Sequence, residues 1–95
     1  MKRVRHLVAY DIRDPKRLRR VHRTMKGFGM PFQYSVFLCD LTKAERFELW
    51  TELEDIIDRS EDTIASVELG DPSTSKAFTF LGPRPDMPRQ GPTII

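Results

Sequence analysis

The sequence predicts an α+β sandwich in which two helices cover one face of an antiparallel sheet. Strand-type and helix-type patterns alternate along the chain in the order strand, helix, strand, helix, strand, and each predicted helix carries one apolar stripe. With a break in the middle strand, this order predicts a ferredoxin-like arrangement. Ninety-five residues suffice for one such domain. Because one sheet face stays uncovered, we expect a homodimer with the two sheets facing each other.

The first predicted strand and helix meet around Asp11. The mostly apolar run 4–10 is typical of a central strand, and Asp11 follows it directly. Asp14 and Pro15 then predict a helix start, because aspartate accepts hydrogen bonds from the first free amides and proline needs no partner at the first helical position.

The predicted first helix has two different faces. Apolar residues recur at spacings of three and four, and cations occupy the opposite side. We expect Gly27 and Gly29 to end the helix by adopting positive φ. The apolar stripe consists of Leu18, Val21, Met25 and Phe28, and the opposite side carries Lys16, Arg19, Arg20 and Arg23.

A second strand and helix follow. Residues 33–38 are rich in strand-forming side chains, and a short edge segment is predicted over 30–33. Thr42 and Glu45 match the capping box that begins a helix. Its expected core stripe consists of Phe47, Trp50, Leu53 and Ile57, broadened by Leu49 and Ile56.

The last part of the chain divides into two more strands and a tail. Residues 64–69 predict a strand, which the turn-forming cluster 70–73 ends, and 77–81 predict another short strand. Four prolines after Gly82 exclude a further helix or central strand. We therefore place a ferredoxin-like domain at 1–82 and a proline-rich tail at 83–95.

Charge is distributed unevenly along the chain. Residues 1–26 carry ten Lys or Arg against two acids, a net of +8, and residues 40–62 carry nine acids against three bases, a net of −6. The basic region suits phosphate groups and the acidic region suits a basic protein, although solvated helix faces are often as highly charged.

Several classes of function have no support in the sequence. Cys39 is the only cysteine, which excludes an internal disulfide and a cysteine-based zinc site within one chain. No apolar stretch reaches the length of a membrane span, so we expect no membrane association and a cytoplasmic location. There is no phosphate-binding glycine loop, Ser35 lacks a nucleophile elbow, and His6 and His22 do not resemble a catalytic pair.

Asp11 is the candidate metal ligand. A carboxylate at the end of a strand can hold a divalent ion at the rim of the sheet, but Mg²⁺ needs about six oxygen ligands, including water and phosphate oxygens. Two-fold pairing would supply a second Asp11. The alternative is an aspartate that only hydrogen-bonds the turn into the helix. Asp14 is interpreted as the helix cap.

Two motifs occur together in the chain. They are Tyr10-Asp11-Ile12 before an arginine-rich helix, and Gln33-Tyr34-Ser35-Val36-Phe37 with Leu41 before a capped helix. Together they resemble the CRISPR-associated Cas2 family, the smaller of the two core adaptation proteins of CRISPR systems, over about residues 4–69. The resemblance implies a ferredoxin-like homodimer, a final strand over 77–81 that packs on the opposite subunit, and Asp11 coordinating Mg²⁺ or Mn²⁺ across the interface.

The resemblance also implies a function on nucleic acid. Members of the family have been described as metal-dependent endonucleases on RNA or DNA, and as non-catalytic scaffolds that bind duplex DNA beside the Cas1 integrase during spacer acquisition. Leu18 stands where relatives often have a basic residue, and the proline-rich tail is a second departure. The expected backbone-binding residues are Lys16, Arg17, Arg19, Arg20 and Arg23, with Tyr10, Ser35 and Phe37 as supporting motif residues.

We therefore expect a dimeric metal-dependent endonuclease, with Asp11 as catalytic residue, that also binds duplex DNA with the integrase. The alternatives are a catalytically inactive scaffold and a toxin-like ribonuclease of related fold. A ferredoxin-like RNA-binding module has less support, because Tyr34 and Phe37 fall on opposite strand faces and form no stacking platform.

Overall fold

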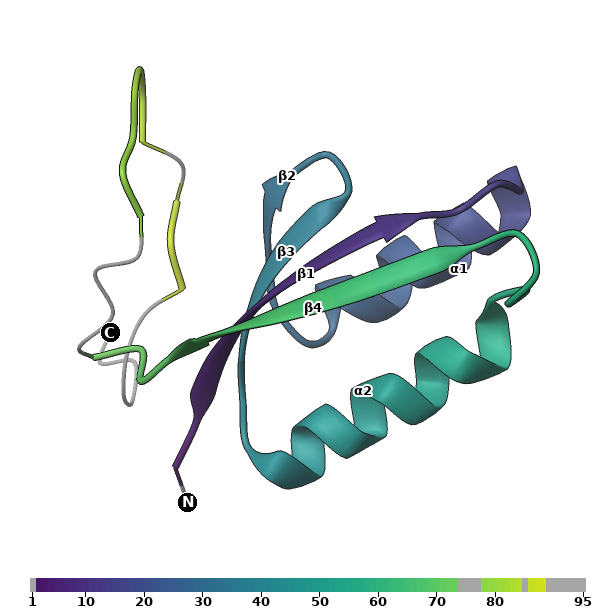
Figure 1. The fold of residues 1–95 in the computed structure, drawn as a ribbon, viewed down its shortest axis with the longest axis horizontal. Helices are drawn as coiled ribbons and strands as arrows, with labels where there is room; N and C mark the ends of the chain where they lie inside the picture. Colours follow the sequence, from purple (N-terminus) through teal and green to yellow (C-terminus); the bar gives the residue numbers. More distant parts are fainter. Residues whose placement is uncertain (1, 74–77, 85, 89–95) are drawn as a thin grey trace.

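The computed structural model describes residues 2–73, 78–84 and 86–88 and shows the predicted α+β sandwich. Four strands form one antiparallel sheet in the order β2-β3-β1-β4, and both helices lie on the same side of it (Figure 1). The elements are β1 (Val4–Asp11), α1 (Pro15–Lys26), β2 (Met30–Gln33), β3 (Val36–Leu41), α2 (Lys43–Ile56) and β4 (Thr63–Gly70).

The core lies between the sheet and the two helices, and it determines where Asp11 points. Val8 and Tyr10 of β1 belong to this core and are 1% and 5% exposed. Side chains alternate along a strand, so Leu7, Ala9 and Asp11 point to the opposite face of the sheet. The rest of the buried cluster consists of Val21, Met25, Phe37, Cys39, Leu41, Leu49 and Leu53.

Both helices begin at the predicted residues. The Asp14 carboxylate accepts a hydrogen bond from the Arg17 amide at 2.9 Å, which confirms Asp14 as the cap of α1. Thr42 Oγ1 accepts from the Glu45 amide at 3.1 Å, and the Glu45 carboxylate accepts from the Thr42 amide at 2.8 Å. The capping box predicted for α2 is therefore confirmed.

The predicted roles of Gly27 and Gly29 are wrong in one respect, because neither adopts positive φ. Gly27 ends α1 with φ −78°, and its N–H donates to the Thr24 carbonyl at 3.0 Å. A Cβ at Gly29 would lie 2.4 Å from the Leu38 carbonyl oxygen and 2.5 Å from Cys39 Sγ. Gly29 is therefore required by its close approach to β3 rather than by a left-handed backbone.

The predicted strand over 33–38 is divided in the structure. Tyr34 and Ser35 form the turn between β2 and β3, and β3 begins at Val36 and continues to Leu41. The two strands pair antiparallel, with a register irregularity between Pro31 and Gln33. The edge segment predicted over 30–33 is confirmed as β2, and the tight hairpin explains why the strand cannot run through residue 34.

The prediction that Phe47 belongs to the core stripe of α2 is wrong, because Phe47 is 76% exposed. Leu49 and Leu53 are buried at 1% and 2% exposure, and Trp50, Ile56 and Ile57 pack partly against the core. Phe47 lies two residues before Leu49, or about 200° around a helix of 3.6 residues per turn. Once Leu49 faces the sheet, Phe47 must therefore face water.

The segment after β4 contacts β2 and β1. Phe78 and Phe80 lie against Phe32, with ring centroids 5.1 and 6.1 Å apart. Arg5 is 4% exposed, forms two hydrogen bonds to the Asp40 carboxylate at 2.8 and 3.0 Å, and donates to the Pro88 carbonyl at 3.3 Å. Phe78, Phe80 and Pro88 therefore lie against the sheet.

The strand predicted over 77–81 is absent from its described part, because residues 78–81 form no strand within this chain. Ala77 lies outside the described residues, as do 89–95 of the predicted tail. Packing of this segment on a second subunit stays a prediction. No helix in the described residues is long and apolar enough to cross a bilayer.

Candidate carboxylate site and nucleic-acid interface

Asp11 is an exposed carboxylate at the end of β1. It pairs with Thr63 of β4, and its side chain is 67% exposed. Arg13 Nη2 lies 3.5 Å from Asp11 Oδ2, and both side chains are about two-thirds exposed. An ion pair this exposed contributes about 0–1 kcal/mol, so little holds the carboxylate in place. Asp11 is therefore available to a ligand.

The donor chemistry of Asp11 fits a hard cation, but one chain provides only part of a site. Carboxylate oxygens, water and phosphate oxygens are the ligands that Mg²⁺ prefers. No group of three or more His, Cys, Asp or Glu residues capable of holding a metal occurs in the described part of the chain. A site at Asp11 would therefore need ligands from a second copy of the chain, from water or from nucleic acid.

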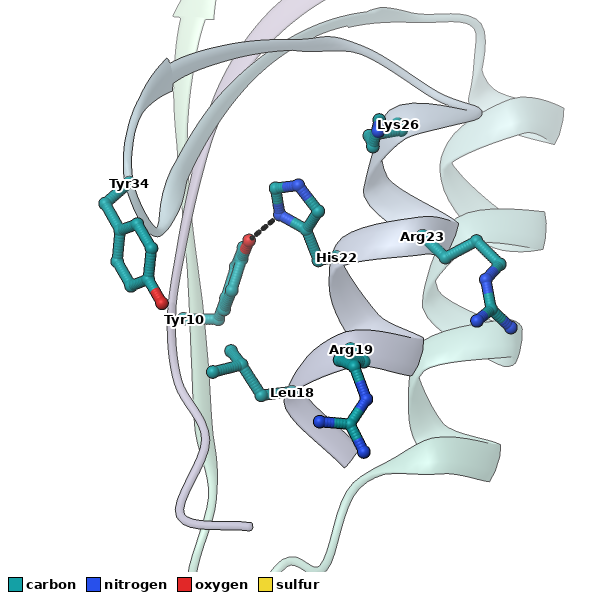
Figure 2. A pocket seen from close by; sticks show the side chains of 7 residues that line it. All are labelled: Tyr10, Leu18, Arg19, His22, Arg23, Lys26 and Tyr34. Carbon is teal, nitrogen blue, oxygen red and sulfur yellow. Dashed lines mark hydrogen bonds between the residues drawn. The ribbon is translucent and has the colours of Figure 1, made fainter. Parts of the chain in front are cut away.

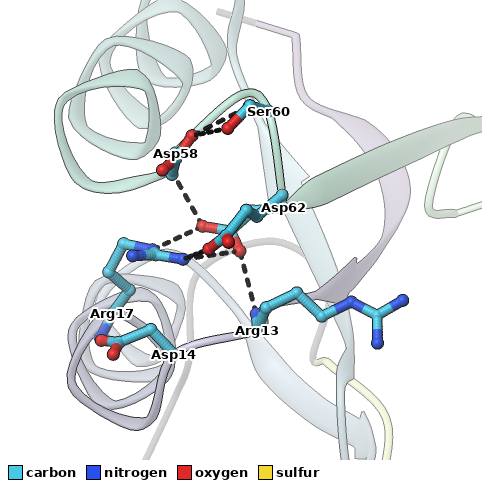
Figure 3. A network of polar contacts seen from close by, with 7 residues as sticks. Arg13, Asp14, Arg17, Asp58, Ser60 and Asp62 are labelled. Atoms are coloured by element: carbon cyan, nitrogen blue, oxygen red, sulfur yellow. Dashed lines mark hydrogen bonds and ion pairs between the residues drawn. The ribbon is translucent and has the colours of Figure 1, made fainter.

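A second aspartate at the same end of the sheet has the opposite character. The Asp62 side chain is fully buried and accepts four hydrogen bonds (Figure 3). The donors are the amides of Arg13 and Asp58, both at 2.9 Å, and the Nε and Nη2 atoms of Arg17, at 2.7 and 3.2 Å. The Arg17 guanidinium, together with the two amides, holds the pKa of Asp62 well below its ordinary range against the effect of burial.

The hydrogen bonds of Asp62 fix the loop that joins Asp11, at the end of β1, to α1. Asp62 joins the loop after β1, through the Arg13 amide, to the loop before β4, through the Asp58 amide. Asp14, the residue after Arg13, caps α1. The chain that follows Asp11 is therefore held at Arg13 by the hydrogen bond to Asp62 and at Asp14 by the helix cap.

Arg17, predicted to bind nucleic acid, is committed to the fold in this structure. Its guanidinium binds Asp62 and also donates to Glu61 Oε1 at 2.9 Å, and its side chain is 23% exposed. The Asp62 carboxylate, and then Glu61, raises the pKa of Arg17 above its already high ordinary value. Little of this guanidinium is left for a phosphate.

The other predicted backbone-binding residues are exposed on α1. Within the described part of the chain, none of them lies within ion-pair distance of a carboxylate. We call these four side chains, which share the exposed surface of one helix, the cationic face. They are Lys16, Arg19, Arg20 and Arg23.

The predicted supporting residues build the fold beneath this surface. Phe37 is fully buried, and its ring lies 6.3 Å from that of Tyr10. The Ser35 carbonyl accepts the Tyr10 amide at 3.0 Å. Tyr10 Oη and His22 Nδ1 are hydrogen-bonded at 3.0 Å. These residues join β1, the β2–β3 turn and α1, but among the described residues no hydrogen bond links them to the Asp11 carboxylate.

A cavity of about 430 Å³ lies between α1 and the β2–β3 turn (Figure 2). Sequence reasoning missed it, and it also missed Asp62. A signal existed for each: Tyr34 is an aromatic residue within a strand-like run, and Asp58, Glu61 and Asp62 are closely spaced acids before a strand. The cavity is lined by Tyr10, Leu18, Arg19, His22, Arg23, Lys26 and Tyr34.

Comparison with known proteins agrees with this geometry. Residues 4–77 match the family model of the CRISPR associated protein Cas2. A protein of Rhodospirillum rubrum called CRISPR-associated endoribonuclease Cas2 1 is 48% identical over 65 residues, which cover 68% of this chain and 64% of that protein. The match thus spans slightly less than two-thirds of that relative.

Two solved structures have the same fold. The crystal structure of Streptococcus pyogenes Cas2 at pH 6.5 superposes with a TM-score of 0.72 at 35% identity, covering 82% of this chain and 99% of that one. A hypothetical protein from Thermus thermophilus superposes with a TM-score of 0.76 at 25% identity, covering 87% and 95%.

Proposed function

The chain belongs to the CRISPR-associated Cas2 family, and from that premise we propose that it acts in CRISPR adaptation as a homodimeric, metal-dependent endonuclease on RNA or DNA. In the same role it binds duplex DNA beside the Cas1 integrase. The observation that carries the proposal is an exposed, weakly paired Asp11 at the end of β1, one short loop away from the helix that bears the cationic face.

The face of the sheet without helices supports the homodimer. Asp11, Ala9 and Leu7 lie on this open face, directly opposite Thr63, Ala65 and Val67 of β4. Val67 is 54% exposed, and Ala65 and Thr63 are exposed. Exposed apolar surface on this part of the sheet favours association with a second copy. Pairing through this exposed part of the face, beside β4, would bring the two Asp11 carboxylates onto one shared surface.

Asp11 of each protomer would hold the ion, and the hydrogen bonds of Asp62 hold the loop beside it. When bound, Mg²⁺ or Mn²⁺ supplies Lewis-acid chemistry by polarising a phosphoryl oxygen and lowering the pKa of a bound water. The Asp62 network fixes the loop after β1, so that the backbone between Asp11 and α1 is held while the Asp11 side chain stays accessible to a ligand. The Asp11–Arg13 ion pair is weak enough to yield to a ligand.

The cationic face binds the phosphodiester backbone. Its side chains are exposed and unpaired within the described residues, so contact with phosphates requires no internal ion pair to break. Phosphate contacts of this kind position a nucleic acid without reading its sequence, and they weaken steeply with salt. This property serves cleavage and scaffolding equally.

A scaffold without nuclease activity is the second candidate. It is favoured by the cationic face, whose exposed side chains can bind duplex DNA whether or not Asp11 holds a metal. The names of the relatives favour the nuclease, because the Rhodospirillum rubrum protein is called an endoribonuclease. The toxin-like ribonuclease loses support because the Cas2 family match extends over residues 4–77.

Cleavage of labelled single-stranded RNA and duplex DNA tests the proposal. Wild type, Asp11→Ala and Asp11→Asn are compared with Mg²⁺, with Mn²⁺ and with chelator, after light scattering has shown that each is a dimer. Glu48→Ala, which removes one exposed carboxylate from α2, is the matched control. We expect metal-dependent cleavage by wild type and Glu48→Ala and none by the Asp11 variants.

The opposite result is equally informative. If wild type cuts neither substrate but binds duplex DNA in a salt-sensitive manner, and if Asp11→Asn binds as tightly, the nuclease proposal fails and the scaffold replaces it. Cleavage that survives in both Asp11 variants would overturn the assignment of Asp11.

A further inference from the structure

We propose that the cavity between α1 and the β2–β3 turn is a subsite for one unpaired nucleotide, whose base stacks on Tyr34 and whose phosphate binds the cations of α1. The inference rests on the proposed nucleic-acid function and names a binding site within the same interface. It concerns a different set of residues from Asp11 and Asp62.

Tyr34 provides the stacking surface. It sits in the turn between β2 and β3 and is 85% exposed, although a tyrosine ring gains by leaving water. Its side chain stands beside Tyr10 at one wall of the cavity (Figure 2). Exposed aromatic rings next to cations are the surfaces on which single-stranded bases stack.

The floor of the cavity is largely apolar, with one hydrogen-bonding group. Leu18 and the ring of Tyr10 line it, and Tyr10 Oη is paired with His22 Nδ1 at 3.0 Å. Among the described residues, His22 Nε2 has no hydrogen-bond partner and can meet the polar edge of a base. A site with an apolar floor and few polar groups is typical of small-ligand pockets of about 300–1,000 Å³.

Three cations of α1 supply the charge. Arg19, Arg23 and Lys26 recur at spacings of four and three, so they follow one side of the helix along the cavity. All three are exposed, and none pairs with a carboxylate among the described residues. Arg19 and Arg23 belong to the cationic face, which places the cavity at its margin.

A second cavity shows what this one has in addition. It has about 410 Å³ and is lined by Trp50 and Arg59, but also by the carboxylates Glu54 and Asp62. The side chain of Arg59 is paired with Glu54. Carboxylates disfavour a phosphate there, whereas the cavity at Tyr34 has only cations and a histidine as titratable neighbours, apart from its tyrosines.

The proposal makes a prediction about strandedness. In a duplex both faces of an internal base are covered by its neighbours, so Tyr34 can stack only on an unpaired or terminal base. The cationic face alone binds the phosphates of either form and does not read the bases. The site therefore adds affinity for single-stranded segments and contributes nothing to an internal duplex contact.

Fluorescence anisotropy with a short 5′-phosphorylated oligothymidine and a capped hairpin duplex tests this. A second strand of equal length, with abasic sites in place of the bases, is the control probe. We expect Tyr34→Ala to weaken binding of oligothymidine about fivefold or more, the lower limit for loss of one stacked base. Tyr34→Phe retains the affinity, and both variants bind the abasic strand and the capped duplex like wild type.

Competition distinguishes the source of the nucleotide. If thymidine monophosphate displaces oligothymidine from wild type but not from Tyr34→Ala, the cavity also takes free nucleotides. If thymidine monophosphate displaces oligothymidine from neither protein, the cavity takes a nucleotide only as part of a strand. Inorganic phosphate is the control competitor, and it should leave the Tyr34 effect unchanged.

The proposal is overturned if Tyr34→Ala binds oligothymidine like wild type, or if the abasic strand responds to Tyr34→Ala as strongly as oligothymidine does. Salt-sensitive duplex binding that persists in that case leaves the proposed function standing without this site. Loss of all nucleic-acid binding by wild type would refute the proposed function itself. Circular dichroism confirms that both Tyr34 variants are folded.

Discussion

Asp11 and Asp62 lie at the same end of the sheet but have opposite environments. Asp62 directly precedes Thr63, the strand partner of Asp11. The Asp62 carboxylate is buried and accepts four hydrogen bonds, whereas Asp11 is 67% exposed and has one weak ion pair to Arg13. A carboxylate whose oxygens are all bound by its own chain holds the fold. One that its own chain leaves open is free to bind something else.

The arginines of α1 divide in the same way. Arg17 is bound by Asp62 and Glu61, whereas Arg20 is exposed and unpaired among the described residues. Both belong to one arginine-rich run, and the pattern of charges does not separate them. The difference depends on which of them faces the loop before β4.

The largest expected effect is on stability, from Asp62→Ala. The change leaves the amides of Arg13 and Asp58 without their acceptor and Arg17 without its main partner. Each unsatisfied amide costs about 1–3 kcal/mol in free energy of unfolding, so the two together cost about 2–6 kcal/mol. Urea unfolding followed by circular dichroism measures it, and Asp58→Ala, which keeps the amide of residue 58, is the comparison. A loss below about 0.5 kcal/mol would show that Asp62 is not structural.

The next effect is on affinity, from removing the unpaired cations. We expect the triple variant Arg19→Gln, Arg20→Gln and Arg23→Gln to bind duplex DNA at least tenfold more weakly than wild type. The slope of log affinity against log salt should also fall by about 0.9 for each phosphate that the variant no longer neutralises. Arg17→Gln should keep the slope of wild type and lose stability instead. An equal change of slope in both variants would refute the division between these arginines.

Acid sharpens the same contrast. The pKa of Asp62 is depressed in the folded state, so its contribution to stability is fully present above the unfolded value, near 4, and is lost as pH falls through the folded value. The difference in unfolding free energy between wild type and Asp62→Asn should therefore be constant from pH 7 to 5 and shrink below about pH 4. A difference that stays constant to pH 2 would show that the ionised form is not the stabilising one.

The smallest expected effect is that of Asp11→Asn on stability. Its only ion pair among the described residues is solvent-exposed, so the free energy of unfolding should stay within about 0.5 kcal/mol of wild type. Urea unfolding without divalent ions measures it. A larger loss would mean that Asp11 supports the turn into α1, which was the alternative interpretation of this residue.

Much of the fold follows from local signals in the sequence. Asp14-Pro15 and Thr42 with Glu45 begin helices through contacts among residues three apart, and such contacts depend on little else. The run 4–10 before Asp11 is mostly apolar, which is also a local signal. The sequence therefore places Asp11 correctly at the end of a strand.

The features that were wrong or missed depend on distant contacts. The hydrogen bonds of Asp62 to Arg17 join residues 45 apart, and the need for glycine at position 29 arises from β3. The sequence pattern allows either Phe47 or Leu49 to face the core, and only packing against the sheet shows that Leu49 is the buried one. A count of charges gives the sign of a surface but not which arginine is already bound by an acid.

Binding of Mn²⁺ to the dimer without nucleic acid, by isothermal titration calorimetry, tests the central claim most directly. We expect one ion for each pair of chains in wild type and none in Asp11→Asn, with binding unchanged in the folded control Glu48→Ala. One ion per chain, or equal binding by Asp11→Asn, would contradict the claim that the open carboxylate at the end of β1 is the functional one.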